Sequence, residues 1–199
     1  LRMIIVEKPY ASEYLIDTIA QNDWAVLEND AIVSAEIEEG AFDIIPSEVA
    51  KNYYLTQEYP LIYSNSENAI SWVQENLPES NLTSYIKLFK DKAAFRELLQ
   101  ELHPDFYFKV VNFDELKGLD TSAIKFPVVL KPAVGFLSFG VHKIKEASEW
   151  EDTVSKLDKE IKVASSMFSK NIVDSSKFII EELVQGEEYA IDAYFDRDG

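Results

Sequence analysis

Lysine and glycine residues surround one loop in the middle of the chain, in a pattern suited to binding an anion. Residues 126–141 read FPVVLKPAVGFLSFGV: an apolar, β-branched run ends at Lys131, and Gly135, Ser138 and Gly140 follow. Two predicted strands therefore flank a loop that has a lysine at its entrance. Glycine lets backbone N–H groups approach an anion, and lysine supplies a positive charge. An ordinary hairpin with a long loop has the same pattern, because Gly and Ser are common in turns.

A second stretch, near the end of the chain, contains paired carboxylates that a ligand could meet. Two strands are predicted to end the chain, residues 177–184 (KFIIEELV) and 188–196 (EYAIDAYFD). Side chains alternate along a strand, so Glu181 and Glu182 lie on opposite faces and at most one of them faces the ligand. The same argument separates Glu187 from Glu188. We favour Glu188, which shares its face with Asp192.

A third candidate cation opens a predicted helix. Asp91 is the expected N-cap of a helix over residues 91–99, and it places Lys92 in the first turn. A lysine there opposes the helix dipole at a cost of ~0.3–1 kcal/mol, so a binding role for Lys92 competes with an ordinary surface position. Arg96 and Lys109 are counted as cations outside the site.

The glycines of the loop are expected to serve its movement. We predict that replacing Gly135 and Gly140 together by valine hinders closure of the loop and spares folding. The premise is that glycine allows backbone conformations that a β-branched residue resists, and unchanged nucleotide affinity in the double variant would show that the loop does not cover a phosphate.

Composition restricts the classes of function that need to be considered. The 199 residues are 47% hydrophobic and carry a formal net charge of −17, which fits a globular protein and argues against nucleic-acid and acidic-membrane partners. The absence of cysteine excludes disulfides, thiolate metal sites and cysteine nucleophiles, and it fits a cytoplasmic location.

The elements that position these residues divide into two predicted domains, residues 1–85 and 86–199. A strand at 3–7, a helix at 11–21 and a strand at 24–27 open the first domain as an α/β unit. Its first turn contains no glycine, so the dinucleotide-binding fingerprint is absent. A helix at 66–77 ends at Pro78, and we place the domain boundary in or just after that break, near residues 78–86.

Three stretches, taken in order, resemble the ATP-grasp superfamily and its carboxylate–amine ligases. They are Asp91-Lys92 at a helix start, Lys131-Pro132 before a Gly/Ser loop, and Glu181–Val184 followed by Gly186–Asp192. The resemblance covers about residue 87 to the end of the chain. It implies an α/β fold in which a small N-terminal domain of the pre-ATP-grasp kind precedes the first, α+β part of an ATP-grasp domain that is cut short.

The resemblance also implies roles for individual residues. Two lysines, Lys92 and Lys131, would meet the phosphates of ATP, and the loop containing Gly135, Ser138 and Gly140 would fold over them. At the other end of the nucleotide, the implied adenine hinge consists of Glu181 and the backbone of Glu182 to Val184. Glu188 would bind the ribose hydroxyls, and Asp192 would reach the substrate side.

The cofactors implied are ATP and Mg²⁺, with metal ligands expected beyond Gly199 and none assigned within the chain. The implied activity is that of a ligase that activates a small carboxylate as an acyl phosphate for attack by an amine or similar nucleophile. We expect the 199-residue chain alone to be inactive and to associate or fray at the edge of Tyr189–Phe195, so a homo-oligomer is possible. Two alternatives stay open, a non-catalytic nucleotide-binding or interaction module and a plain α/β domain with an accidental motif match.

Overall fold

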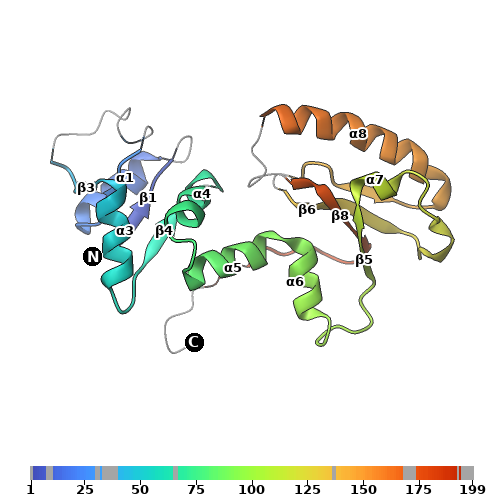
Figure 1. Cartoon of the computed structure of the whole chain (residues 1–199), viewed down its shortest axis with the longest axis horizontal. Helices are drawn as coiled ribbons and strands as arrows, with labels where there is room; N and C mark the ends of the chain where they lie inside the picture. Colours follow the sequence, from blue (N-terminus) through green and yellow to red (C-terminus); the bar gives the residue numbers. More distant parts are fainter. Residues whose placement is uncertain are drawn as a thin grey trace.

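The computed structural model contains two sheets, one in each half of the chain (Figure 1). It describes residues 2–7, 11–29, 32, 40–64, 67–135, 138–167, 174–191 and 193. In the described ranges each sheet has four strands, with the orders β3-β2-β1-β4 and β5-β8-β6-β7. None of the helices in these ranges combines the length and the apolarity that a membrane span requires.

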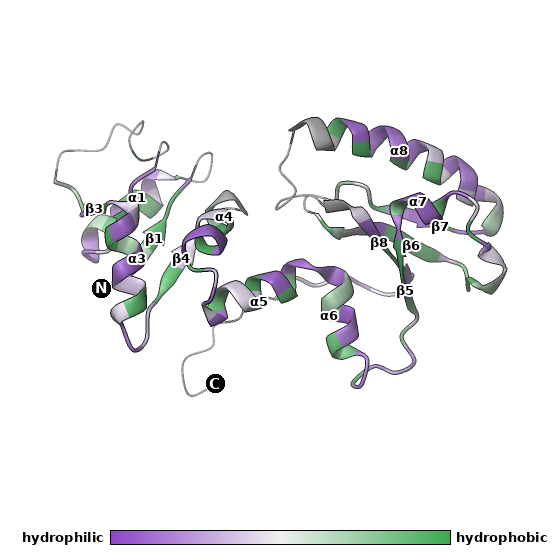
Figure 2. Ribbon diagram, in the orientation of Figure 1, coloured by the Kyte–Doolittle hydropathy of each residue, from purple (hydrophilic) through white to green (hydrophobic). Residues whose placement is uncertain are grey.

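The first sheet is parallel and has helices on both faces, as alternating strands and helices predict. Its strands are β1 (Met3–Ile5), β2 (Ala25–Leu27), β3 (Ile44–Ile45) and β4 (Ile62–Ser64), and its helices are α1 (Glu13–Gln21), α3 (Ser47–Thr56) and α4 (Glu67–Asn76). Met3 and Ile5 pack with residues of α3 and α4, whereas Ile4 packs with Ile19 of α1. Alternation along β1 thus supplies both cores, and the central strands are green throughout in Figure 2.

The second sheet is antiparallel and is formed by β5 (Phe108–Asn112), β6 (Val128–Val134), β7 (His142–Ile144) and β8 (Asp174–Glu182). Two helices, α7 (Phe113–Leu116) and α8 (Trp150–Met167), cover one face over a core that includes Leu130 and Phe178. The short helices η1 (Thr121–Ala123) and η2 (Ala147–Glu149) lie in the connections. The opposite face carries a smaller cluster in which Ala93 of α6 (Lys92–Leu99) packs on Ala133 and Ile179. Figure 1 shows α8 and α6 on opposite sides of this sheet.

A helix that the sequence analysis missed, α5 (Asn81–Lys90), connects the two halves. Ser80 caps it by accepting a hydrogen bond from the Thr83 amide, and Leu82 and Ile86 pack against the first core. At its other end Phe89 lies 5.3 Å from Phe95 of α6, measured between ring centroids. The proposed division after residue 85 therefore falls inside a helix, and it stays a prediction.

Several predicted element bounds were wrong. The strand with Lys131 does not end there, because β6 continues to Val134 with a register shift between Pro132 and Val134. A bulge is one of the few places where a sheet tolerates a proline. Ser47 begins α3 rather than capping it, and it accepts a hydrogen bond from Trp72 Nε1 at 2.7 Å.

The last predicted strand is also wrong where the structure describes it. Residues 188–191 and 193 form no strand, and Tyr189 and Ile191 are 76% and 86% exposed. A period of two specifies which side chains share a face, but a strand forms only where another strand pairs with it. The rest of the predicted segment, including Asp192, lies outside the described residues.

Trp150 provides a test of how α8 is held on its sheet. Trp150 is 1% exposed, and its indole Nε1 donates to the Leu116 carbonyl of α7 at 3.1 Å. We expect Trp150→Phe to lower the free energy of unfolding by about 2–4 kcal/mol, because it leaves a void and a buried carbonyl without its donor. Urea unfolding followed by circular dichroism measures this change.

Trp72→Phe is the matched control, since Trp72 is only partly buried and its partner is the Ser47 hydroxyl. Water can donate to that hydroxyl in place of the lost indole N–H, so the expected loss is about 1 kcal/mol. Equal losses for the two variants would contradict the account of the α7–α8 contact.

Candidate functional site

A lysine and a glutamate meet on the α6 face of the second sheet. In the pairing of β6 with β8, Lys131 lies opposite Ile179 and Val129 lies opposite Glu181. Lys131 and Glu181 are therefore diagonal neighbours on one face, close enough for long side chains to meet. The Lys131 ammonium forms an ion pair with Oε2 of Glu181, whose residue is only 4% exposed.

Arg96 of α6 binds the other oxygen of the same carboxylate. Its Nε lies 2.6 Å from Oε1 of Glu181, and its guanidinium carbon lies 4.3 Å above the centroid of the Phe106 ring. The ring restricts where the guanidinium can lie, and the cation gains a favourable contact with the ring face. One buried carboxylate is thus shared by cations from α6 and β6.

The two cations determine the protonation state of Glu181. Burial by itself would raise the pKa of this carboxyl, but the hydrogen bonds and positive charges of Arg96 and Lys131 outweigh burial and hold the pKa below its ordinary value. Glu181 is therefore ionised at neutral pH. Its stabilising effect is present above the ordinary pKa of a glutamate and is lost as the pH falls through the lowered pKa.

The start of α6 lies against the start of the Gly/Ser loop. Asp91 caps the helix by accepting hydrogen bonds from the Ala93 and Ala94 amides at 2.9 and 3.2 Å. Lys92 follows, and its Nζ donates to the Gly135 carbonyl at 3.0 Å. Since Gly135 comes directly after β6, this bond places the Lys92 ammonium at the root of the loop.

The conformation of the loop depends on its second half. Gly140 has a φ of +65°, and a Cβ there would lie 3.1 Å from Pro132 Cγ and 3.3 Å from Leu157 Cδ1. Ser138 also has a positive φ, 57°, and its carbonyl accepts a hydrogen bond from Val141 N at 3.2 Å. A Cβ on Gly135 would have only ordinary contacts, the nearest at 3.6 Å. Residues 136–137 lie outside the described part of the chain.

Comparison with known proteins shows which fold this chain resembles. Residues 124–199 match the family described as "ATP-grasp domain". A solved structure of similar fold is the L-amino acid ligase from Bacillus licheniformis, with a TM-score of 0.57 and 14% identity over 93% of this chain and 47% of that one. The chain contains part of an ATP-grasp fold.

Two further structures of similar fold are biotin carboxylases. The enzyme from Campylobacter jejuni gives a TM-score of 0.57 at 14% identity, covering 92% of this chain and 45% of that one. The biotin carboxylase domain from Hydrogenobacter thermophilus, solved with MgADP and bicarbonate, gives 0.56 at 13%, covering 92% and 44%. The chain thus spans about half the length of these structures. No curated protein matches the sequence.

In this ATP-grasp part, the predicted hinge consists of Glu181 and Glu182 at the end of β8 and the two residues that follow them. The amide of Glu182 donates to the Tyr107 carbonyl at 3.0 Å and that of Leu183 donates to the Pro127 carbonyl at 3.1 Å. Val184 follows, 71% exposed, and lines a cavity of about 230 Å³ together with Arg96. Within the described residues nothing accepts a hydrogen bond from the Val184 amide, so it is the one of these three that could donate to a base.

The ribose-binding residue predicted for the ATP-grasp site does not reach the cluster. Glu188 is exposed and makes no ion pair with any described residue. Its neighbour Glu187 accepts a hydrogen bond from the Tyr189 hydroxyl. Without the predicted strand, no pairing fixes which way the Glu188 side chain faces.

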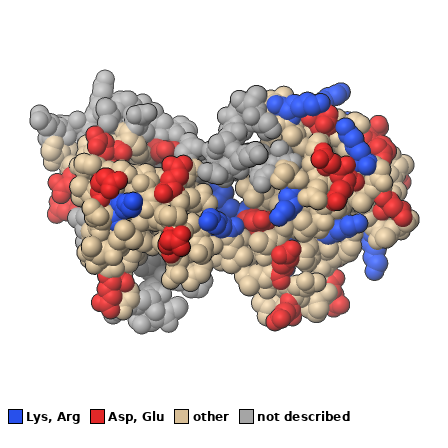
Figure 3. Space-filling model, viewed as in Figure 1, with Lys and Arg blue, Asp and Glu red and all other residues tan. Residues whose placement is uncertain are grey.

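The described residues offer no preformed metal site. They contain no group of three or more His, Asp or Glu side chains that could hold an ion. Figure 3 shows acidic side chains spread over both halves of the face in view, with Lys and Arg side chains near the middle and more of them over the half that contains the second sheet. Lys92, Lys131 and Arg96 belong to a chain whose formal net charge is −17.

Arg96 is the residue of the site that sequence reasoning missed. It was counted as a cation outside the site, whereas the structure places it on Glu181 together with Lys131. The signal lay in the spacing: Arg96 follows Lys92 by four positions, so both lie on one face of α6. If one of them contacts the sheet, the other does so one helical turn further along.

The glycine prediction needs a correction, which itself can be tested. Valine at Gly140 would be strained by the positive φ and would press on Pro132 and Leu157, so the double substitution is expected to destabilise the fold. We expect Gly140→Ala to lower the free energy of unfolding by about 1–2 kcal/mol or more, because alanine resists the left-handed region and contacts the core.

Gly135→Ala is the matched control and should change the free energy of unfolding by less than about 0.5 kcal/mol. Urea unfolding of both variants measures the difference. Equal effects would show that the φ of Gly140 does not constrain the loop.

Proposed function

We propose that this chain is the ATP-binding portion of an ATP-dependent ligase that joins a carboxylate to an amine. The observation that carries the proposal is the position of two lysines around one loop: Lys92 donates to Gly135 at its root, and Lys131 lies on the strand that leads into it. Triphosphate binding needs this combination of cations and a flexible, glycine-containing backbone. The ATP-grasp fold supports the same proposal.

Each residue of the site has a specific task in this proposal. Lys92 and Lys131 neutralise phosphate oxygens and orient the triphosphate, and the loop that ends at Gly140 covers it. The Val184 amide and the neighbouring carbonyls of the hinge bind the edge of the base. Glu188 binds the ribose once its segment has a neighbour. These tasks are positioning and electrostatic stabilisation, which dominate catalysis of phosphoryl transfer.

The proposed reaction has two steps. A carboxylate oxygen of the substrate attacks the γ-phosphorus of ATP, the bond to the β–γ bridging oxygen breaks, and an acyl phosphate and ADP form. The amine then attacks the carbonyl carbon, phosphate leaves, and the amine nitrogen loses a proton. In the first step the lysines stabilise the charge that develops on the transferring phosphoryl group and on ADP.

Mg²⁺ would supply positive charge to the phosphate oxygens in this reaction. None of the described side chains is assigned to it, because they form no acidic cluster. A small carboxylate, an amine and a cytoplasmic location complete the proposal, the last on the cysteine-free composition. A homo-oligomer is also proposed, because Tyr189 and Ile191 are strongly exposed.

The activity is tested with hydroxylamine, which captures an acyl phosphate as a hydroxamate. We expect the product of the complete reading frame to release ADP and form a hydroxamate when given MgATP and a suitable carboxylate. Free amino acids are the first to try, because an L-amino acid ligase is among the structures of similar fold. The 199-residue chain is assayed in parallel. ATP binding without ADP release from any carboxylate would favour a nucleotide-binding module without chemistry.

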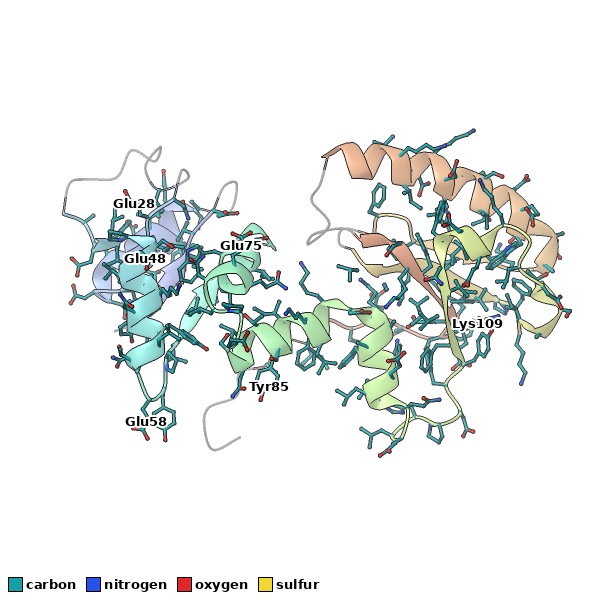
Figure 4. The ribbon with its side chains drawn as sticks, in the orientation of Figure 1. Glu28, Glu48, Glu58, Glu75, Tyr85 and Lys109 are labelled. Atoms are coloured by element: carbon teal, nitrogen blue, oxygen red, sulfur yellow. The ribbon has the colours of Figure 1, made fainter. Side chains whose placement is uncertain are left out.

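The contribution of Lys131 is measured by calorimetry with ATP. Lys131→Ala should weaken binding by ~1.5–3 kcal/mol, the cost of one charge-assisted contact with phosphate. Lys109→Ala is the control, since Lys109 is an exposed residue of β5 (Figure 4). Its neighbour Phe108 pairs with Glu181, so the Lys109 side chain points to the opposite face of the sheet. Equal losses would indicate general attraction by positive charge rather than a site.

A further inference from the structure

The Glu181 carboxylate has a separate cation for each of its oxygens. Arg96 Nε lies 2.6 Å from Oε1, and the Lys131 ammonium contacts Oε2. The side chain of Glu181 is 5% exposed, against 19% for Lys131 and 30% for Arg96. The carboxylate is therefore the buried member of the cluster, and it depends on these cations rather than on water.

If Lys131 binds a phosphate, its pairing with Glu181 must weaken. An ionised carboxylate that loses its partner in a buried position is destabilised by several kcal/mol, or it takes up a proton. Either outcome would oppose binding of an anionic ligand by Lys131. A second cation that stays on Glu181 removes this cost.

We propose that Arg96 is a positioning residue that keeps Glu181 ionised and in place while Lys131 moves from the carboxylate to a nucleotide phosphate. This inference rests on the proposed function, because it assigns Lys131 to a phosphate. It gives the two cations of the cluster different roles, because Lys131 exchanges partners and Arg96 does not.

The surroundings of Arg96 suit a fixed partner. Its guanidinium lies over the Phe106 ring at 4.3 Å, and its Nε donates to Oε1 of Glu181. It belongs to α6, whose Lys92 one turn earlier is held by the Gly135 carbonyl and whose Ala93 is buried on Ala133. The helix thus holds Arg96 over the end of β8, independently of Lys131.

In the described part of the chain, few other charged groups could take the place of Arg96 beside Glu181. The charges that act on Glu181 are Arg96 from α6 and Lys131 from β6, while β5 places Phe108 opposite it in the sheet. Glu182 follows on the other face of the strand. Loss of Arg96 therefore leaves Lys131 as the partner of this carboxylate.

The first test measures proton uptake on binding of MgATP by the product of the complete reading frame. Calorimetry in buffers of different ionisation enthalpy gives the number of protons taken up at neutral pH. We expect Arg96→Ala to bind about tenfold more weakly and to take up more protons than the wild type, because Glu181 is protonated when Lys131 leaves it. Arg96→Lys should restore most of the wild-type proton balance, and Lys109→Ala should match the wild type.

A purely structural role for Arg96 gives a different result. Arg96→Ala would then lower the free energy of unfolding but take up the same number of protons as the wild type on binding, and this outcome would overturn the proposal. Unfolding of each variant by urea, at the same pH, confirms that the folded state is being compared.

The second test needs no nucleotide, so it separates failure of this inference from failure of the proposed function. In Lys131→Ala, which mimics departure of the lysine, carbon-detected NMR follows the titration of the Glu181 carboxyl. We expect Glu181 to stay ionised at neutral pH in this variant and to have a higher pKa when Arg96→Ala is added. A Glu181 that is already protonated at neutral pH in Lys131→Ala would overturn the role of Arg96, whether or not the protein binds ATP. If the wild type binds no ATP while this titration behaves as expected, only the proposed function fails.

Discussion

The buried carboxylate of Glu181 is the interaction on which this half of the structure depends. It joins three elements, because it belongs to β8 and is bound by Lys131 of β6 and Arg96 of α6. A buried charge is tolerated only when it is paired, so the carboxylate fixes where both cations must lie. The helix, the central strands and the loop root are thereby held in one arrangement before any ligand binds.

Because the carboxylate and its cations lie on one face of the second sheet, the two faces differ in what they contain. On one face, Leu130, Phe178 and Ile180 pack under α8 in a dry core. On the other face the same strands present Lys131 and Glu181 beneath a single short helix. Alternation along β6 and β8 makes this division possible, since neighbouring residues of one strand serve the core and the site in turn.

Helix α6 is positioned by local as well as tertiary contacts. Asp91 caps its first turn, and the small Ala93 allows it to approach Ala133 and Ile179 closely. Lys92 and Arg96, one turn apart, then reach the loop root and the end of β8. The cations of the site thus come from a rigid element, whereas Ser138 and Gly140 give the loop a conformation that most residues resist.

The sequence by itself determined the α/β character, the helix start at Asp91-Lys92 and the hairpin around the Gly/Ser loop, because caps, turn residues and periodicity act locally. It also determined the likeness to ATP-grasp proteins. Missed were α5, the extension of β6 past Lys131, and the lack of a strand at 188–191. The tertiary structure alone decided that Arg96 belongs to the site and that Gly140, not Gly135, contacts the core. The spacing of Lys92 and Arg96 places both on one face of α6, but it does not specify that this face meets Glu181, 85 positions from Arg96 in the chain. Nor does any local pattern specify that Leu157 of α8 lies near Gly140.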